Sequence, residues 1–143
     1  MDKQHYQALA EFRYQIRLFL HFSEKAAREA AIEPQQHQLL LAVRGFAGEG
    51  EGPTVGYLAE RLQIRHNTTV ELIDRMEERR MIRRRHGDID KRQVVVELMK
   101  PGEKLLEKLS EEHLAEVSQT GPALIEALQG VLSRAGVQAG VEI

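Results

Sequence analysis

Residues 54–98 read TVGYLAERLQIRHNTTVELIDRMEERRMIRRRHGDIDKRQVVVEL. Apolar side chains recur at helical steps over residues 55–62, and after a break the same pattern returns over residues 70–76. Strand character follows over residues 82–86 and 93–98, with strong turn chemistry between the two strands. This order predicts a helix-turn-helix followed by a β-hairpin wing, an arrangement that makes double-stranded DNA the leading candidate partner.

The second predicted helix carries short polar and basic side chains near its amino end. A recognition helix reads base edges in the major groove with such groups, while its other face anchors it to the domain. Asn67 is equally compatible with a role as the helix cap, and Thr69 with simple packing. The candidate DNA contacts on this helix are Arg65, His66, Asn67, Thr68, Thr69 and Arg75.

The predicted hairpin opens with three successive arginines, residues 83–85. Residues 61–92 hold ten Lys or Arg and six Asp or Glu, a net charge of +4 in a chain whose formal charge is -2. A local positive face can bind phosphate, because counterion release depends on the cations at the contact. Alternate strand residues face opposite sides, so one or more of these cations will be structural. The candidate DNA contacts in the wing are Arg84, Arg85, Lys91 and Arg92.

The rest of the chain is predicted to be helical. One amphipathic helix spans about residues 4–29, a second runs from Pro34 to about Phe46, and a fifth begins at Pro101. Gly121 and Pro122 are expected to end the fifth helix before a sixth.

The fold class is therefore mainly α with a small β-hairpin wing. We expect a single domain over residues 1–143, with a winged helix-turn-helix lobe at 34–99 and helical dimerisation regions at 1–33 and 100–143. The glycine-rich segment 45–53 lacks a phosphate-binding motif, and its two glutamates would repel phosphate, so it is interpreted as a flexible connection with little functional weight.

Composition argues against several classes of protein. With no cysteine, the chain has no disulfide framework, thiolate zinc site or cysteine nucleophile. Only 5% of its residues are aromatic, which argues against a base-stacking single-strand binder. No nucleophile motif, carboxylate pair or cofactor motif is visible, so we expect neither an enzyme nor a cofactor. No apolar run is long enough for a membrane span, and the protein is expected to be soluble and cytoplasmic.

Four strings together resemble the MarR (multiple-antibiotic-resistance regulator) family across essentially the whole chain: Val55–Leu62, Leu72–Arg79, Ile82–Arg84 and Asp90–Arg92. The resemblance implies a homodimer held by the first, fifth and sixth helices, a palindromic operator, and release by a small ligand lodged between the dimer platform and the DNA-binding lobe.

Two positions depart from the family pattern. Gly87 stands where the wing usually carries an acid, and Met99 stands where a hydroxyl residue usually caps the fifth helix. Asp90 and Arg92 still match, and we interpret Asp90 as a buttress that orients Arg92 through a charge-assisted hydrogen bond.

The effector pocket implied by the resemblance lies among the first, second and fifth helices. The polar candidates there suit an aromatic acid or another amphipathic anion, although Arg13 and Arg17, each taken alone, are more readily interpreted as solvated or as dimer salt bridges. A metal-responsive variant would use Glu24, His37 and His113, but no two histidines stand three or four residues apart, so no metal site is assigned. The candidate pocket residues are Arg13, Arg17, His21, His37 and His113.

These observations favour a dimeric, sequence-specific DNA-binding regulator, more readily a repressor than an activator. The alternatives are a metal-responsive regulator of the same fold and a winged-helix module that binds only protein partners. The three arginines of the hairpin argue against the second alternative, because a protein-only module has no reason to concentrate them there.

Overall fold

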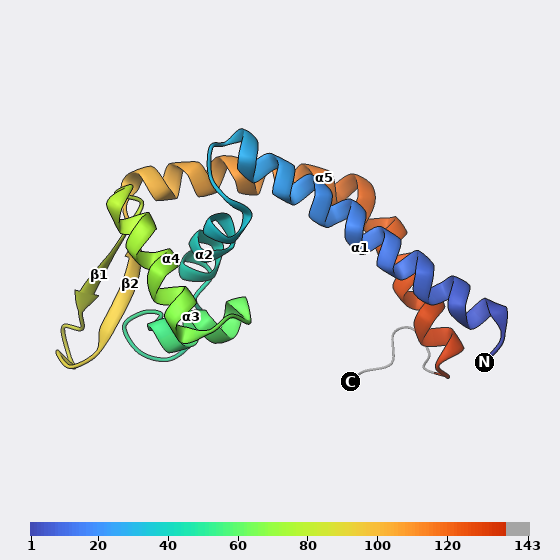
Figure 1. Cartoon of the computed structure of the whole chain (residues 1–143), viewed down its shortest axis with the longest axis horizontal. Helices are drawn as coiled ribbons and strands as arrows, with labels where there is room; N and C mark the ends of the chain where they lie inside the picture. Colours follow the sequence, from blue (N-terminus) through green and yellow to red (C-terminus); the bar gives the residue numbers. More distant parts are fainter. Residues whose placement is uncertain (137–143) are drawn as a thin grey trace. The chain divides into compact units, whose positions relative to one another are not determined.

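The computed structural model describes residues 1–136 (Figure 1). The elements, in chain order, are α1 (Lys3–Glu29), α2 (Pro34–Arg44), α3 (Val55–Leu62), α4 (His66–Glu78), β1 (Ile82–His86), β2 (Val94–Leu98) and α5 (Lys100–Arg134). They form two compact units. We call Ala27–Ser110 the winged lobe, and Met1–Ala26 with the described residues from Glu111 onward the helical unit. No helix in the described part of the chain is long and apolar enough to span a membrane.

The helix boundaries of the winged lobe follow from local chemistry. Pro34 lies in the first turn of α2, where its missing N–H costs nothing. The Thr54 hydroxyl accepts a hydrogen bond from the backbone N–H of Tyr57 at 3.2 Å and caps α3. Gln63 adopts a left-handed conformation, with φ of 56°, and ends α3. Arg65 is the N-cap of α4, so the interpretation of Asn67 as the cap was wrong.

The core of the winged lobe is aliphatic. Helices α2, α3 and α4 pack against one another, and α2 and α3 also pack against β2. Fully burying one such side chain contributes about 1.5–3 kcal/mol to stability. Because the buried face of α4 holds the helix to the lobe, its opposite face can carry polar side chains. The residues that are at most 1% exposed in this lobe are Ala27, Leu39, Leu40, Leu58, Thr69, Ile73, Met76, Ile82, Val95, Val96 and Leu109.

The wing is a two-stranded antiparallel hairpin in which Ile82 pairs with Leu98 and His86 with Val94. The backbone N–H of Gly87 donates to the carbonyl of Gln93 at 2.9 Å and closes the hairpin above the turn. The first predicted strand is confirmed over residues 82–86, and the second begins one residue later than predicted.

Helix α5 is continuous, and the prediction that Gly121 and Pro122 would end it was wrong. A proline inside a helix removes one backbone hydrogen bond and strains the preceding turn, but it does not force the helix to stop. Val117 and Leu124, on either side of the proline, line the same cavity beside α1. Packing against one partner helix on both sides of Pro122 therefore outweighs the local penalty, and the predicted sixth helix is the carboxyl-terminal part of α5.

Candidate nucleic-acid interface

The first turn of α4 presents His66, Asn67 and Thr68 to solvent, and Arg65 is exposed just before it. Thr69 differs from these neighbours because it is fully buried and its hydroxyl donates to the Arg65 carbonyl at 2.9 Å. The prediction of Thr69 as a DNA contact is therefore corrected in favour of packing. Its role is to anchor the start of the helix, so that the three preceding residues face outward.

Further along α4, Arg75 is exposed. Residues 68, 71 and 75 are spaced by three and four positions, so Arg75 shares a helix face with Thr68 and Glu71. Both Thr68 and Glu71 are exposed as well. The polar face that the sequence predicted is thus continuous from the amino end of α4 to its third turn.

Arg84 joins the wing to α4. Its Nε donates to Glu77 Oε1 at 3.0 Å, its backbone N–H donates to Glu77 Oε2 at 3.0 Å, and its terminal nitrogen Nη2 pairs with both Glu77 and Asp74. The side-chain hydrogen bond from Arg84 is the main cause that lowers the pKa of Glu77, and the same bond raises the pKa of Arg84. Arg84 was predicted as a DNA contact, but its guanidinium is already engaged by two carboxylates.

Arg83 and Arg85 lie on the opposite face of β1 and share one acid of the neighbouring strand. Arg85 Nε donates to Glu97 Oε2 at 2.9 Å, and Arg83 pairs with Glu97 Oε1. The hydrogen bond from Arg85 is the largest influence on the pKa of Glu97, and the net shift is downward. The expectation that the arginines would alternate, with at least one of them structural, is confirmed. Arg85, predicted as a DNA contact, is engaged by Glu97 and pairs the two strands of the wing.

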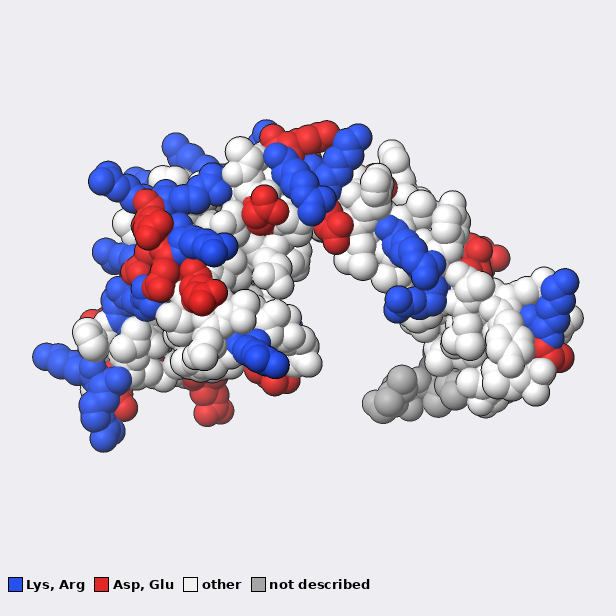
Figure 2. Space-filling view, in the orientation of Figure 1, with Lys and Arg blue, Asp and Glu red and all other residues white. Residues whose placement is uncertain are grey.

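The tip of the wing carries two further exposed cations. Lys91 is exposed, and 93% of the Arg92 side chain is accessible. Asp90 Oδ1 accepts from Arg92 Nε at 3.1 Å and from the Arg92 backbone N–H at 3.1 Å, and the side-chain bond is the main cause that lowers the pKa of Asp90. The predicted Asp90–Arg92 pair is therefore present. Figure 2 shows basic side chains projecting from this end of the winged lobe.

The residue that sequence reasoning missed is Glu51. Its Oε1 accepts hydrogen bonds from the backbone N–H of Asp88 at 2.6 Å and of Ile89 at 3.2 Å. Its Oε2 lies 3.3 Å from the N–H of Ile89 and 3.5 Å from that of Asp90. Desolvation acts to raise the pKa of Glu51, but these three N–H groups together hold it below its ordinary value. The glutamate interpreted as repelling phosphate instead holds the wing turn.

The segment around Glu51 is packed against the hairpin. The Val96 backbone N–H donates to the Pro53 carbonyl at 2.9 Å, and a Cβ at Gly52 would lie 3.3 Å from Val95 Cβ. The interpretation of residues 45–53 as a connection with little functional weight was therefore wrong. No local signal could have revealed this, because Glu51 and the turn are 37 residues apart in the sequence.

Gly87 departs from the family pattern for a reason that the structure makes plain. A Cβ at this position would lie 2.2 Å from Glu51 Oε2 and 2.6 Å from the Asp90 carbonyl oxygen. Any side chain would therefore collide with the carboxylate that holds the turn. At this point of the wing the negative charge comes from Glu51.

The predicted effector residues lie in both units. In the helical unit, Arg13, Arg17 and His21 are exposed along α1 at four-residue steps. His113 is half-buried, and its Nε2 is 2.8 Å from the Ser23 hydroxyl. The ring edges of Phe19 and Phe22 flank the His113 ring, with centroid distances of 6.1 and 5.2 Å. His37 belongs to the winged lobe and is 2% exposed.

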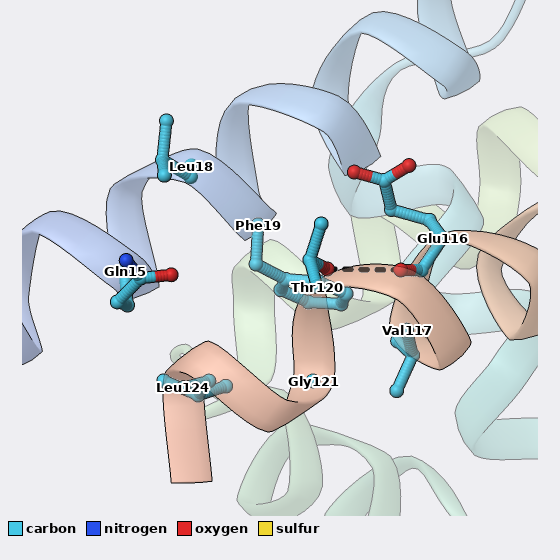
Figure 3. A pocket seen from close by; sticks show the side chains of 8 residues that line it. All are labelled: Gln15, Leu18, Phe19, Glu116, Val117, Thr120, Gly121 and Leu124. Carbon is cyan, nitrogen blue, oxygen red and sulfur yellow. Dashed lines mark hydrogen bonds between the residues drawn. The ribbon is translucent and has the colours of Figure 1, made fainter. Parts of the chain in front are cut away.

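A cavity of about 170 Å³ lies between α1 and α5 in the helical unit (Figure 3). None of the five predicted effector residues lines it. Its walls are Gln15, Leu18, Phe19, Glu116, Val117, Thr120, Gly121 and Leu124. Within residues 1–136, no group of three or more His, Asp or Glu side chains is arranged to hold a metal ion.

Comparisons with known proteins agree with this architecture. Residues 32–93 match the sequence model of the MarR family. No protein of curated function matches the sequence. Among solved structures, the chain is similar to AbsC, a MarR family transcriptional regulator from Streptomyces coelicolor, with a TM-score of 0.73 and 20% identity over 95% of this chain and 94% of that one.

Two further structures carry bound molecules. A MepR mutant from S. aureus, bound to an oligodeoxyribonucleotide, gives a TM-score of 0.61 with 22% identity over 87% of this chain and 94% of that one. CouR from Rhodococcus jostii, bound to p-coumaroyl-CoA, gives 0.65 with 18% identity over 87% of this chain and 88% of that one. Residues 32–93 thus match the MarR family model, and the fold of the chain is that of solved MarR family regulators.

Proposed function

We propose that this protein is a sequence-specific transcription regulator that binds double-stranded DNA and is not an enzyme. The observation that carries the proposal is the pairing, within one lobe, of an exposed polar helix end with an exposed basic wing tip. His66, Asn67 and Thr68 offer donors, acceptors and a methyl group of the kind that base edges in the major groove require. Lys91 and Arg92 offer cations for the backbone or for a narrow minor groove.

Arg65 and Arg75 complete the proposed contact surface as phosphate ligands on either side of the reading residues. Arg84 and Arg85 act differently, because their guanidiniums are paired with acids of α4 and β2. We assign Arg84 the task of holding the wing against the reading helix, and Arg85 that of holding the two strands of the wing together. Phosphate contacts position a protein on DNA and base contacts specify the sequence, so this division assigns specificity to α4 and general affinity to the wing tip.

The protein acts as a homodimer in this proposal. The helical unit exposes large apolar side chains on both of its helices, including Tyr6 at 60%, Leu114 at 71% and Ile125 at 58%. Soluble monomers rarely leave so much apolar surface uncovered, and a second copy would bury it. A two-fold dimer would place two α4 helices on half-sites about 34 Å apart, matching a palindromic operator.

Such a dimer would work most simply as a repressor in the cytoplasm, because a protein seated on an operator blocks polymerase without further machinery. We propose release by a small amphipathic or aromatic-acid ligand, and the CoA ester bound to the similar protein CouR supports a ligand of that kind. Arg13, Arg17, His21, His37 and His113 remain the predicted pocket residues. No observation favours metal control. Because Arg83, Arg84 and Arg85 are paired with acids, they no longer argue against a protein-only module, and the exposed Lys91 and Arg92 carry that argument instead.

Selection of binding sites from a random duplex library tests the proposal, followed by measurement of the winner's affinity against salt concentration. We expect an inverted repeat, a dimer by analytical ultracentrifugation, and an affinity that falls steeply with salt. No enrichment, together with weak and salt-insensitive binding, would refute DNA reading and favour the protein-only alternative.

A further inference from the structure

The wing tip has backbone N–H groups with few partners of their own. The backbone pairing of the two strands ends at Gly87, and the next three residues form an exposed turn in which Ile89 is 92% accessible. The N–H groups of Asp88, Ile89 and Asp90 all point to one carboxylate, that of Glu51. Successive backbone N–H groups around one anion form a nest, a concavity that binds anions.

We propose that Glu51 is a positioning residue for DNA binding: its carboxylate holds the wing-tip turn in the conformation that presents Lys91 and Arg92 to the DNA backbone. This inference rests on the proposed function and deepens it. Glu51 itself, a carboxylate, makes no contact with DNA and acts only through the turn.

The contacts connect Glu51 to the exposed cations step by step. Asp90 donates its N–H to Glu51, while its side chain accepts two hydrogen bonds from Arg92 at 3.1 Å. The Asp90 carbonyl also accepts from the Gln93 backbone N–H at 3.1 Å, which closes the turn on the β2 side. The conformation of Asp90 therefore sets the direction of Arg92, and Glu51 holds that conformation from the opposite side.

An opposite role for Glu51 is conceivable, in which it occupies a nest that a DNA phosphate would otherwise take. The packing of residues 51–53 argues against a carboxylate that a phosphate could displace. Pro53 is buried and bonded to Val96, and Gly52 lies against Val95. The absence of a side chain at Gly87 also leaves the space that the Glu51 carboxylate occupies. A residue held on both sides in this way is built into the hairpin.

The test compares Glu51→Gln with the matched control Glu49→Gln. Both changes remove one negative charge from the same loop, and within residues 1–136 the exposed Glu49 side chain has no hydrogen bond or ion pair. By charge alone, both variants should bind DNA slightly more tightly. If Glu51 positions the tip, Glu51→Gln should instead weaken binding to specific and random duplexes about tenfold at low salt, and reduce the salt slope by about 1 to 2.

Amide hydrogen exchange supplies a readout that does not depend on DNA. Exchange at Asp88 and Ile89 should accelerate in Glu51→Gln and in Glu51→Ala, but not in Glu49→Gln, while the core amides of α4 stay protected in all three. That pattern separates a released turn from an unfolded lobe.

The outcomes are distinct. If the wild-type protein binds no DNA, the proposed function fails. If the wild type binds and Glu51→Gln binds as Glu49→Gln does, the positioning role is overturned although the regulator remains. Tighter binding by Glu51→Gln than by Glu49→Gln would overturn it in favour of competition with phosphate.

Discussion

Replacing Arg84 with alanine tests whether this residue ties the wing to α4 or contacts DNA. The sequence alone suggested a phosphate ligand, whose loss would weaken binding to all sequences and reduce the salt slope. The structure instead places its guanidinium on Glu77 and Asp74 of α4. Removing it leaves two carboxylates facing each other without a counter-charge. We therefore expect a loss of stability in the winged lobe before any loss of a phosphate contact.

The size of this loss of stability depends on how exposed the three charged side chains are to solvent. Side chains of Arg84 and Glu77 are each 30% accessible, and Asp74 is 49% accessible. A hydrogen bond to a charged group contributes about 1.5–3 kcal/mol when shielded, and an exposed ion pair about 0.2–1 kcal/mol. Screening at this partly open site reduces the Glu77 contacts to about 1 kcal/mol and the Asp74 pair to about 0.5 kcal/mol. The sum, about 1.5 kcal/mol, corresponds to a fall in Tm of about 5 °C for a chain of this size.

Urea and thermal unfolding at neutral pH measure this difference, and a double-mutant cycle with Glu77→Gln isolates the pair. The coupling energy should be about 1 kcal/mol, because both single changes remove the same contact. Arg83→Ala is the matched control on the same strand. Its pair with Glu97 leaves the Arg83 side chain 58% accessible, so its loss should cost less than about 0.5 kcal/mol.

One combination of results would refute the reasoning. If Arg84→Ala unfolds like the wild type, shows no coupling to Glu77, and still lowers the salt slope of DNA binding by about 1, then Arg84 is a phosphate ligand. The contacts with α4 would in that case contribute nothing measurable to the fold.

Three further predictions concern other contacts. Arg92→Ala should weaken binding to specific and random duplexes alike and lower the salt slope by about 1, because its side chain is 93% exposed at the wing tip; an unchanged slope would exclude a phosphate contact. Thr68→Ala should cost about 1–3 kcal/mol on the selected site only, and equal losses on random DNA would exclude base reading. Acidification should destabilise the lobe: Glu77 and Glu97 have lowered pKa values when folded, so their contribution is complete above the unfolded glutamate pKa of about 4.3 and is lost as pH falls through the folded values. Unfolding curves between pH 7 and 3 measure this loss, which Glu77→Gln should reduce.

Short stretches of sequence predicted most of the helices and strands, because the residues that begin and end these elements lie within them or next to them. Thr54 caps α3 with its own hydroxyl, and Pro34 begins α2 by its ring geometry, so both boundaries are readable from a few residues. The same local reasoning failed at Pro122. At Pro122 the helix continues because α5 packs along α1, and no short window of sequence contains that contact.

The candidate site divides in the same way. Helical periodicity identified the outward face of α4. Strand alternation indicated that the arginines of residues 83–85 point to opposite faces of β1, but neither pattern predicted which acid each arginine pairs with. Arg84 forms hydrogen bonds with acids seven and ten residues earlier in the chain, whereas Arg85 bonds to an acid twelve residues later. Thr69 stands among exposed neighbours in the sequence, yet it is buried because it falls on the inner side of the first turn.

By itself, then, the sequence determined the order of helices and hairpin, the concentration of positive charge between residues 61 and 92, and the Asp90–Arg92 pair, since each depends on residues close together in the chain. Only the tertiary structure decided which cations face solvent and what holds the wing turn. Those outcomes depend on carboxylates brought in from elsewhere, above all Glu51 across 37 residues. A hydrogen bond forms only where folding brings its two atoms within about 3 Å, a condition that sequence spacing does not state.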